Sequence, residues 1–461
     1  MRSVICVLIV FVSAHAVIGQ WIKQTVDTTA SLRGLSVVNE KVVWASGTGG
    51  TVIRTIDGGK TWKVMTVTGA DKLDFRDIEA FDANTAYILS IGNGESSRIY
   101  KTTDGGATWK EQFRNKNEKA FYDAIACWDR NNCIAMSDPV DGKFVLINTK
   151  DGGATWRPMD TDKMPSAKEG EAAFAASGTC LITQGKNNVF LVTGGSAARV
   201  FRSNNRGLTW FVADTPIVSG TQGSGIFSIA MRDAKNGVIV GGNYERPDER
   251  NNTVAMTLDG GATWRLVARL KGYRSAVAYL DQKAIISVGT NGTDFSFDRR
   301  MLWKQLGKEN MNAVIANGRN AIWAVGPNGR VSNFDPRAIP EYERFDPNRT
   351  DYPHVVNIDA LRLSHRVIST TCAPSDAECS SNPKITVQAV AMGFVSPHEY
   401  LYTVTAGTVL GDKHTVEWDL LNVKPGTYTI TAAISIPAFL SSSETFWGVY
   451  GRTETVVVVV K

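Results

Sequence analysis

Histidine is missing from most of this chain. Of the five histidines, His15 lies near the N-terminus and the others are at positions 354, 365, 398 and 414. The stretch 20–335 therefore cannot hold a Ser-His-Asp or Cys-His catalytic triad or a histidine-rich metal site. The cysteine spacings match no zinc pattern either, so we expect no metal site.

Nucleotide-binding sequences, basic runs and long apolar runs are also lacking. No Gly-x-Gly-x-x-Gly sequence opens a helix after a strand, so we expect no cofactor. The net charge is only +5 over 461 residues, without a run of lysine or arginine, so we expect no nucleic-acid partner. After residue 19 no segment approaches twenty apolar residues, and we expect no transmembrane segment.

Residues 1–19 are typical of a secretory signal peptide. Arg2 is basic, residues 4–12 are apolar, and either Ala14-His15-Ala16 or Val17-Ile18-Gly19 offers small residues for cleavage. We therefore expect an exported protein, periplasmic or secreted.

Export permits disulfides, and five cysteines remain beyond residue 19. Cys127 and Cys133 flank a predicted hairpin turn, while Cys372 and Cys379 bracket a loop rich in Pro, Ser and Asp. We expect a disulfide within each of these two pairs. Cys180 is left over, and we expect a buried, unpaired thiol.

The chain is rich in one feature, an eight-residue block that ends in tryptophan. Each block has a hydroxyl residue, then an acidic or amide residue two positions later, and ends in tryptophan, and the first five blocks also contain glycine. The six copies span residues 55–62, 102–109, 149–156, 203–210, 257–264 and, in worn form, 296–303. Their marker residues are Asp57 and Trp62, Asp104 and Trp109, Asp151 and Trp156, Asn205 and Trp210, Asp259 and Trp264, and Asp298 and Trp303.

The block predicts a tight turn between two strands. The carboxylate or amide and the hydroxyl bond backbone amides, and glycine supplies a positive φ. Each tryptophan should bury roughly 150 to 250 Å² between neighbouring sheets, on the order of 4 to 6 kcal/mol before entropy. This structural role explains the aspartates better than calcium binding does.

Successive blocks predict the blades of a propeller. The third residues of the first five blocks are 47 residues apart twice and then 54 apart twice, and periods near 40 to 50 suit blades. The segment Trp44–Val52 returns as Trp323–Val331, which adds a seventh blade. That blade lacks an outer strand, so we expect the segment around Trp21 to supply it and close the ring.

Beyond the propeller, residues 336–353 have the composition of a linker and residues 354–461 show short alternating strands. The segments 402–407, 416–420 and 425–430 resemble Ig-like modules of bacterial exported proteins. The predicted fold is thus all-β. A seven-bladed propeller over residues 20–335, closed by its N-terminal strand, precedes a C-terminal Ig-like β-sandwich.

Blade topology predicts where a binding site lies. The block turns share one face with the turns between first and second strands, and the other face receives the starts of the inner strands. Arg33, Arg76 and Arg274 should meet there, where two like charges about 10 Å apart repel by roughly 1.7 kcal/mol at an effective dielectric of 20. Either an acidic ligand or internal neutralisation by Glu171, Asp77 and Asp123 offsets this repulsion.

Other candidates lie on the same face. Tyr122 begins an inner strand, as Glu171 is expected to do. Asp138 and Tyr244 belong to two polar loops, residues 137–143 and 242–247, that serve either binding or as tolerated insertions.

These features together resemble one family, the exported propellers known as photosystem II stability/assembly factors. The resemblance covers about residues 20–335. It rests on the Asp-Gly-Gly-Ala-Thr-Trp blocks, the Trp-Ala-x-Gly turns and residues 137–142, 171–178 and 225–229, which are similar to the non-photosynthetic bacterial branch. The resemblance implies chaperone-like binding of an assembling membrane complex, helped by arginines that correspond to Arg33, Arg76 and Arg274.

We therefore expect a non-enzymatic, exported protein that binds a protein partner as an assembly or scaffold factor. The alternative is a glycoside hydrolase of the sialidase-like type, because sialidases are also Asp-box propellers. Tyr122, Glu171 and Asp77 would then be the catalytic candidates. Against it, no Phe/Tyr-Arg-Ile-Pro sequence precedes the first block.

Overall fold

The computed structural model describes residues 21–267, 270–282, 284–297, 302–335, 357–364, 366–369, 379–392, 399–411, 414–441 and 444–460. These residues form strands, loops and one 3-10 turn, η1 (Gly94–Ser96), with no α-helix. They divide into two compact units, one holding nearly all described residues up to Asp335 and the other those from Asn357 on. The predicted signal peptide and linker lie outside the described residues. No helix among the described residues is long and apolar enough to cross a membrane.

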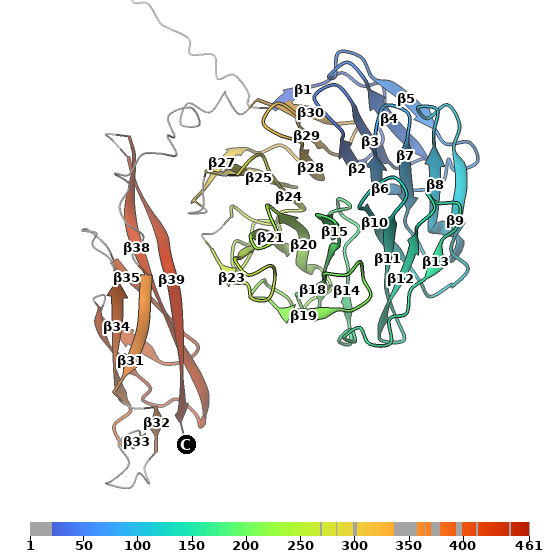
Figure 1. The fold of residues 1–461 in the computed structure, drawn as a ribbon. Helices are drawn as coiled ribbons and strands as arrows, with labels where there is room; N and C mark the ends of the chain where they lie inside the picture. Colours follow the sequence, from blue (N-terminus) through green and yellow to red (C-terminus); the bar gives the residue numbers. More distant parts are fainter. Residues whose placement is uncertain are drawn as a thin grey trace, which may run out of the picture. The chain divides into compact units, whose positions relative to one another are not determined.

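The first unit is a succession of small antiparallel sheets, which Figure 1 shows side by side around a ring. The first two sheets are β2 (Leu32–Val37), β3 (Val43–Gly47), β4 (Thr51–Thr55) and β5 (Lys63–Thr66), then β6 (Phe75–Ala80), β7 (Ala86–Ser90), β8 (Arg98–Thr102) and β9 (Lys110–Arg114). The next two are β10 (Tyr122–Cys127), β11 (Cys133–Val140), β12 (Lys143–Thr149) and β13 (Arg157–Pro158), then β15 (Leu181–Gln184), β16 (Asn188–Val192), β18 (Arg199–Ser203) and β19 (Phe211–Asp214).

Three further sheets complete this unit. The fifth has β20 (Ser224–Met231), β21 (Gly237–Asn243), β22 (Val254–Thr257) and β23 (Arg265–Leu266), extended by the short strands β17 (Gly194–Gly195) and β14 (Glu171–Ala172). The sixth has β24 (Ala276–Tyr279), β25 (Ala284–Gly289), β26 (Gly292–Phe297) and β27 (Leu302–Gly307). The last has β28 (Ala313–Ala316), β29 (Ile322–Val325), β30 (Val331–Phe334) and β1 (Trp21–Lys23).

The N-terminal strand joins the last sheet, which confirms the pairing predicted for the segment around Trp21. Trp21 pairs with Phe334 in the antiparallel register of β1 and β30, and their ring centroids are 4.9 Å apart. The indole of Trp21 also donates a hydrogen bond to Thr293 Oγ1 at 2.9 Å. The two ends of this unit therefore complete one sheet, and β1 covers the edge that β30 would expose.

The tryptophan blocks form the predicted turns. In the second block Asp104 accepts hydrogen bonds from the Thr108 amide (2.9 Å) and the Thr108 hydroxyl (2.6 Å), and Gly106 donates to Thr102 Oγ1 at 2.9 Å. Gly105 and Gly106 have φ of 73° and 79°, the left-handed region that glycine adopts freely. These bonds, led by the Thr108 hydroxyl, lower the pKa of Asp104 to about 2. The turn thus engages both carboxylate oxygens.

The tryptophans of the first three blocks pack against aromatic residues of the preceding sheet. Trp62 lies edge-on to Trp323 with centroids 5.5 Å apart, Trp109 to Trp44 at 6.3 Å, and Trp156 to Tyr87 at 6.3 Å. The predicted inter-sheet packing is confirmed for these blocks. Of the sixth block, Asp298 lies outside the described residues and Trp303 is in β27.

The expected disulfide between Cys127 and Cys133 is present and joins β10 to β11. Cys180 is a buried free cysteine, as predicted. Cys379 is disulfide-bonded, and its expected partner Cys372 lies outside the described residues.

Replacing Cys127 and Cys133 together with alanine should lower the free energy of unfolding by about 2 kcal/mol, because the bridge closes a short loop in the unfolded chain. Urea unfolding of the natural and double-alanine chains measures this difference. The control is the natural chain and the variant, both reduced, which should unfold alike because reduction also breaks the bond of Cys379. Equal stability of the oxidised natural chain and the oxidised variant would contradict the prediction.

The second unit consists of two sheets. One contains β31 (Asn357–Leu363), β34 (Lys384–Met392), β37 (Thr415–Asp419) and β36 (Thr408–Leu410), and the other β33 (Cys379–Ser380), β32 (Val367–Ile368), β39 (Glu444–Val460), β38 (Gly426–Ser441) and β35 (Glu399–Val404). Its core draws on both sheets, with Trp418 and Ile385 from one and Ile430 and Val458 from the other. The indole of Trp418 donates to the carbonyl of Ala406 at 2.9 Å.

Candidate functional site

Four inner strands carry a β-bulge near their first residue. The register shifts between the first and third residues of β2, β6 and β10, and between the third and fifth residues of β20. A bulge inserts one unpaired residue and re-aims its side chain. The inserted residues are Arg33, Arg76, Asp123 and Phe227. The same local irregularity thus sets one chemically distinctive side chain at an equivalent position in four sheets.

A segment between β14 and β15 connects these positions. Arg33 Nη1 donates to the carbonyl of Ala176 at 3.0 Å, and Arg76 Nη1 to that of Ala175 at 3.3 Å. From the third sheet, Asp138 Oδ1 accepts from the Ala173 amide at 2.7 Å. Ser177 and Thr179 bond to Ser275 and Ser228, at 2.9 and 2.7 Å. We call residues 173–179 the crossing segment. This segment, the four bulged residues and Tyr244, which packs on Phe174 and Phe227, together form what we call the mouth.

The sequence predicted that Glu171 begins the inner strand of the fourth sheet, and this prediction is wrong. That strand begins at Leu181, and Glu171 lies in β14, which pairs with β17. Its buried carboxylate accepts from Arg199 Nε at 2.9 Å and from Thr193 Oγ1 at 2.6 Å. The physical reason is an insertion: the block spacing lengthens from 47 to 54 residues here, and the extra residues form the crossing segment. The change of block spacing was the sequence signal that could have indicated this insertion.

Arg33 and Arg76 form the positive part of the mouth. Arg76 Nε pairs with Asp74 at 2.8 Å, and its side chain keeps 30% exposure. Arg33 has no ion pair among the described residues. Burial and then the charge of Arg76 lower the pKa of Arg33. The two guanidinium groups donate to the carbonyls of adjacent residues, Ala176 and Ala175, so these two arginines lie near each other, as predicted for this pair.

Arg274 does not join them, so the expectation of three arginines at one place is wrong. Arg274 precedes β24 and is fully buried, with its guanidinium 2.5 Å from Asp294 Oδ2 and 2.7 Å from the carbonyl of Tyr273. The buried carboxylate of Asp294 on β26 attracts the cation into the interior. Arg274 thus stabilises the fold, whereas we expected it to bind a partner.

The expected neutralisation of the arginines is only partly present. Glu171 is engaged by Arg199, and Asp77 accepts the amides of Ile78 and Ile125, both at 2.8 Å. Asp123 is near enough to Arg76 for that charge to lower its pKa, although burial and the charge of Asp138 raise it well above the ordinary value. Asp74 and Asp123 are therefore the acidic neighbours of the arginines.

Asp138 links the acidic groups to the crossing segment. Burial raises its pKa to about 6, against the hydrogen bond from Ala173. Asp123 and Asp138 lie close together, and one oxygen of Asp123 is buried without a hydrogen-bond partner among the described residues. Burial likewise raises the pKa of Asp77 to about 7.

Raised carboxyl pKa values predict a stability that falls as pH rises. Between an unfolded pKa of 3.8 and a folded one of about 6, the folded chain holds more protons than the unfolded chain. The free energy of unfolding should therefore decline from pH 4 to pH 6. Asp138→Asn keeps the acceptor for Ala173 and should shrink that decline by on the order of 2 kcal/mol. Urea unfolding across this pH range tests it, and an unchanged slope would refute it.

An aromatic cluster borders the other side of the crossing segment. Phe174 stacks on Phe227 with centroids 3.9 Å apart, and Tyr273 lies edge-on to Phe227 at 4.7 Å. Tyr244 packs edge-on against Phe174 and Phe227, at 6.4 and 6.2 Å, yet remains 48% exposed. The sequence found Tyr244 but not Phe174 or Tyr273, because neither follows the repeat pattern.

Two predicted positions differ from expectation. Residues 137–143 are not a long loop: β11 and β12 continue through them and turn at Asp141 and Gly142, whose φ values are 51° and 82°. Asp138 is consequently held within a strand. Tyr122 is 3% exposed and packs edge-on against Phe113 at 5.3 Å, and burial raises its pKa. Tyr122 is thus a core residue.

Comparisons with known proteins support the architecture. A scan against protein-family models found no match, and neither did a search of curated proteins. Among solved structures, "YCF48 bound to D1 peptide" has 16% identity and a TM-score of 0.51, covering 69% of this chain and 97% of that one. "YCF48 from Cyanidioschyzon merolae" has 15% identity and a TM-score of 0.51, covering 69% and 99%. YCF48 is a photosystem II assembly factor and a β-propeller, so the fold of this region is a β-propeller.

Proposed function

We propose that the chain is an exported, non-enzymatic propeller that binds a protein partner at the mouth, as an assembly or scaffold factor. In this proposal the seven sheets are seven blades over residues 20–335. Residues 1–19 are a signal peptide, residues 336–353 a linker, and residues 354–461 an Ig-like sandwich that spaces or positions the propeller.

The observation that carries the proposal is the bulged position shared by four sheets. With regular pairing each of these residues would lie opposite a residue of the neighbouring strand. The bulges instead bring the side chains of Arg33, Arg76 and Phe227 to the crossing segment. Arg76 and Tyr244 keep exposed surface there. Arginine and tyrosine are enriched at the energetic centres of protein interfaces. A solved propeller of the same fold is described as bound to a peptide, which makes protein binding a reasonable use of this ring.

The glycosidase alternative loses its catalytic candidates. Tyr122 is buried, Glu171 is paired with Arg199, and both oxygens of Asp77 accept backbone amides. None of the three is free to contact a sugar. Hydrolysis of any member of a panel of aryl glycosides and sialosides by the purified chain would nevertheless favour this alternative.

A pull-down from the exported fraction of the source organism tests the proposed binding. The natural chain should retain a partner that Arg33→Gln/Arg76→Gln loses, because glutamine can still donate to the crossing segment but lacks the charge. Arg265→Gln, an exposed arginine on β23, is the matched control and should retain the partner. Quantitative mass spectrometry of the bound proteins measures the ratio. Equal recovery of the partner by the natural and doubly substituted chains, with equal thermal stability, would exclude the mouth as the binding site.

A further inference from the structure

The fourth tryptophan block departs from the other four fully described blocks at three positions. Asn205 replaces aspartate, Arg206 replaces the first glycine and Leu208 replaces alanine or lysine. Because the other blocks form a complete turn without these residues, the turn itself does not require them. The first two changes each shift the local charge by one positive unit.

Arg206 is also conformationally costly. Its φ is 58°, where the equivalent glycines of the other blocks have φ of 71° to 75°, and residues with a side chain adopt this region rarely. Its guanidinium lies over Trp128 at 5.3 Å and donates to the carbonyl of Lys186 at 2.9 Å. Departures of this kind concentrate at functional positions.

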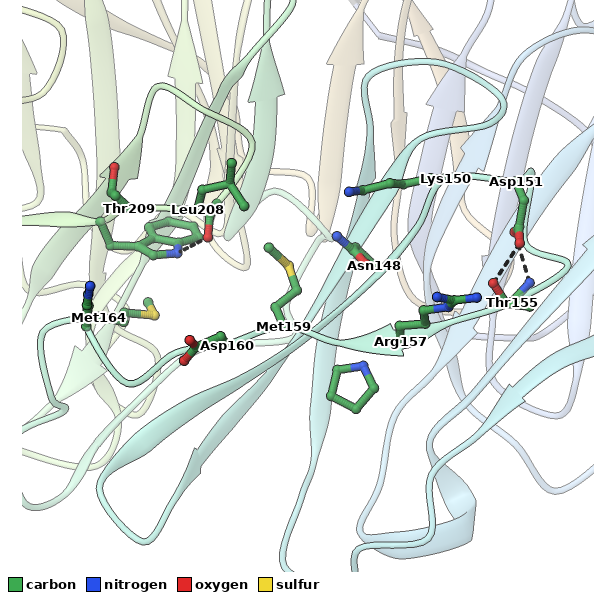
Figure 2. A pocket seen from close by; sticks show the side chains of 14 residues that line it. Asn148, Lys150, Asp151, Thr155, Arg157, Met159, Asp160, Met164, Leu208 and Thr209 are labelled. Carbon is green, nitrogen blue, oxygen red and sulfur yellow. Dashed lines mark hydrogen bonds between the residues drawn. The ribbon is translucent and has the colours of Figure 1, made fainter.

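Leu208 is 72% exposed and forms one wall of a groove of about 650 Å³ between the third and fourth sheets. In Figure 2, Met159 lies between the two walls, with Leu208 and Thr209 on one side and Lys150 and Arg157 on the other. Met164 and the buried Trp210 add further apolar lining. Methionine side chains adapt to different apolar partners.

The rim of this groove is positive and largely unpaired. Lys150, Arg157 and Lys163 are exposed and form no ion pair among the described residues. The nearby carboxylate of Asp151 is engaged by Thr149 and Thr155, and Asp160 accepts from the Asp162 amide at 2.9 Å. These bonds do not cancel the two negative charges, so the lining keeps a net charge of one positive unit, three cations against two carboxylates. The three cationic side chains, unpaired among the described residues, remain available to an incoming group.

We propose that this groove binds an extended acidic peptide segment, with one large apolar side chain seated among Met159, Met164 and Leu208. Carboxylates of the peptide pair with Lys150, Arg157 and Lys163. The apolar floor favours a peptide over nucleic acid or an acidic polysaccharide, because the groove exposes no aromatic ring for a base or sugar to stack on: Trp210 is 6% exposed. The groove begins at two block turns, and none of its lining residues belongs to the mouth, so it would bind independently of the mouth.

A displayed random-peptide library, panned against the full chain, tests the proposal. Counter-selection uses Asn205→Asp/Arg206→Gly/Leu208→Ala, which restores the sequence of the other blocks and places glycine where φ is positive, so it should fold at least as stably. Selected peptides should carry Asp or Glu around one Leu, Phe or Met. Fluorescence anisotropy should show binding about ten-fold weaker to the restored variant, and weaker at high salt.

Matched variants separate the possible outcomes. Lys60→Ala, at the position of the first block that corresponds to Leu208, should leave peptide affinity unchanged, and so should Arg33→Gln/Arg76→Gln at the mouth. Lys163→Glu should weaken it without touching the turn. The proposal is overturned if no selected peptide prefers the natural chain, if the selected peptides are not acidic, or if polygalacturonate or single-stranded DNA binds the groove more tightly than any peptide.

Discussion

Replacing Arg274 with methionine is expected to lower the free energy of unfolding by about 3–5 kcal/mol, because it leaves the buried carboxylate of Asp294 without its cation. Both side chains have no exposure, and they are 2.5 Å apart at their nearest oxygen and nitrogen. Among the described residues, Asp294 Oδ2 otherwise accepts only the Lys271 amide, at 3.0 Å, which cannot replace a charge. Urea unfolding measures the loss.

Two control variants make this prediction specific. Arg265→Met removes an exposed arginine from β23 and should change stability by less than about 0.5 kcal/mol. Arg274→Met/Asp294→Leu removes both charges and should recover much of the loss, because a buried pair can be exchanged for apolar residues at little cost. If Arg274→Met behaves like Arg265→Met, the pair is not the structural contact described.

The second large effect concerns affinity for the partner. Replacing Arg76 with glutamate and Tyr244 with alanine should weaken binding about 100-fold, because it reverses a charge and removes an exposed aromatic anchor at one interface. Isothermal titration with the purified partner measures it. Thermal unfolding of the variant provides the control for folding, and Glu249→Ala in the same loop should leave the affinity unchanged. A loss of less than about three-fold would contradict the role of the mouth.

The sequence predicted the parts of the fold that depend on repetition. The block turns, the packing of Trp62, Trp109 and Trp156 and the pairing of Trp21 with the last sheet follow from local chemistry repeated along the chain. Each copy of the block predicts the same turn, so a copy with a weak pattern can be recognised from the others. The disulfide between Cys127 and Cys133 followed from their place on either side of a short turn.

The site was harder to predict because it lies where the repeat fails. Arg33 and Arg76 were found as inner-strand residues, but the bulges that re-aim them have no sequence signature. Arg274 occupied a similar place in the pattern, yet its side chain is buried because it pairs with Asp294 on β26. That partner is set by tertiary packing and cannot be read from the repeat. The crossing segment was visible only as a longer block spacing, which shows that residues are inserted but not where they lie.

The most direct test of the proposed function is photocrosslinking from the mouth. A benzophenone amino acid in place of Tyr244 should join the partner covalently in the exported fraction, whereas the same group in place of Leu258, which is 61% exposed at the fifth block, should not. Because Leu258 lies on the face with the block turns, the pair of positions compares the two faces of one ring. Crosslinks from Leu258 to the partner without crosslinks from Tyr244 would contradict the binding face proposed for this protein.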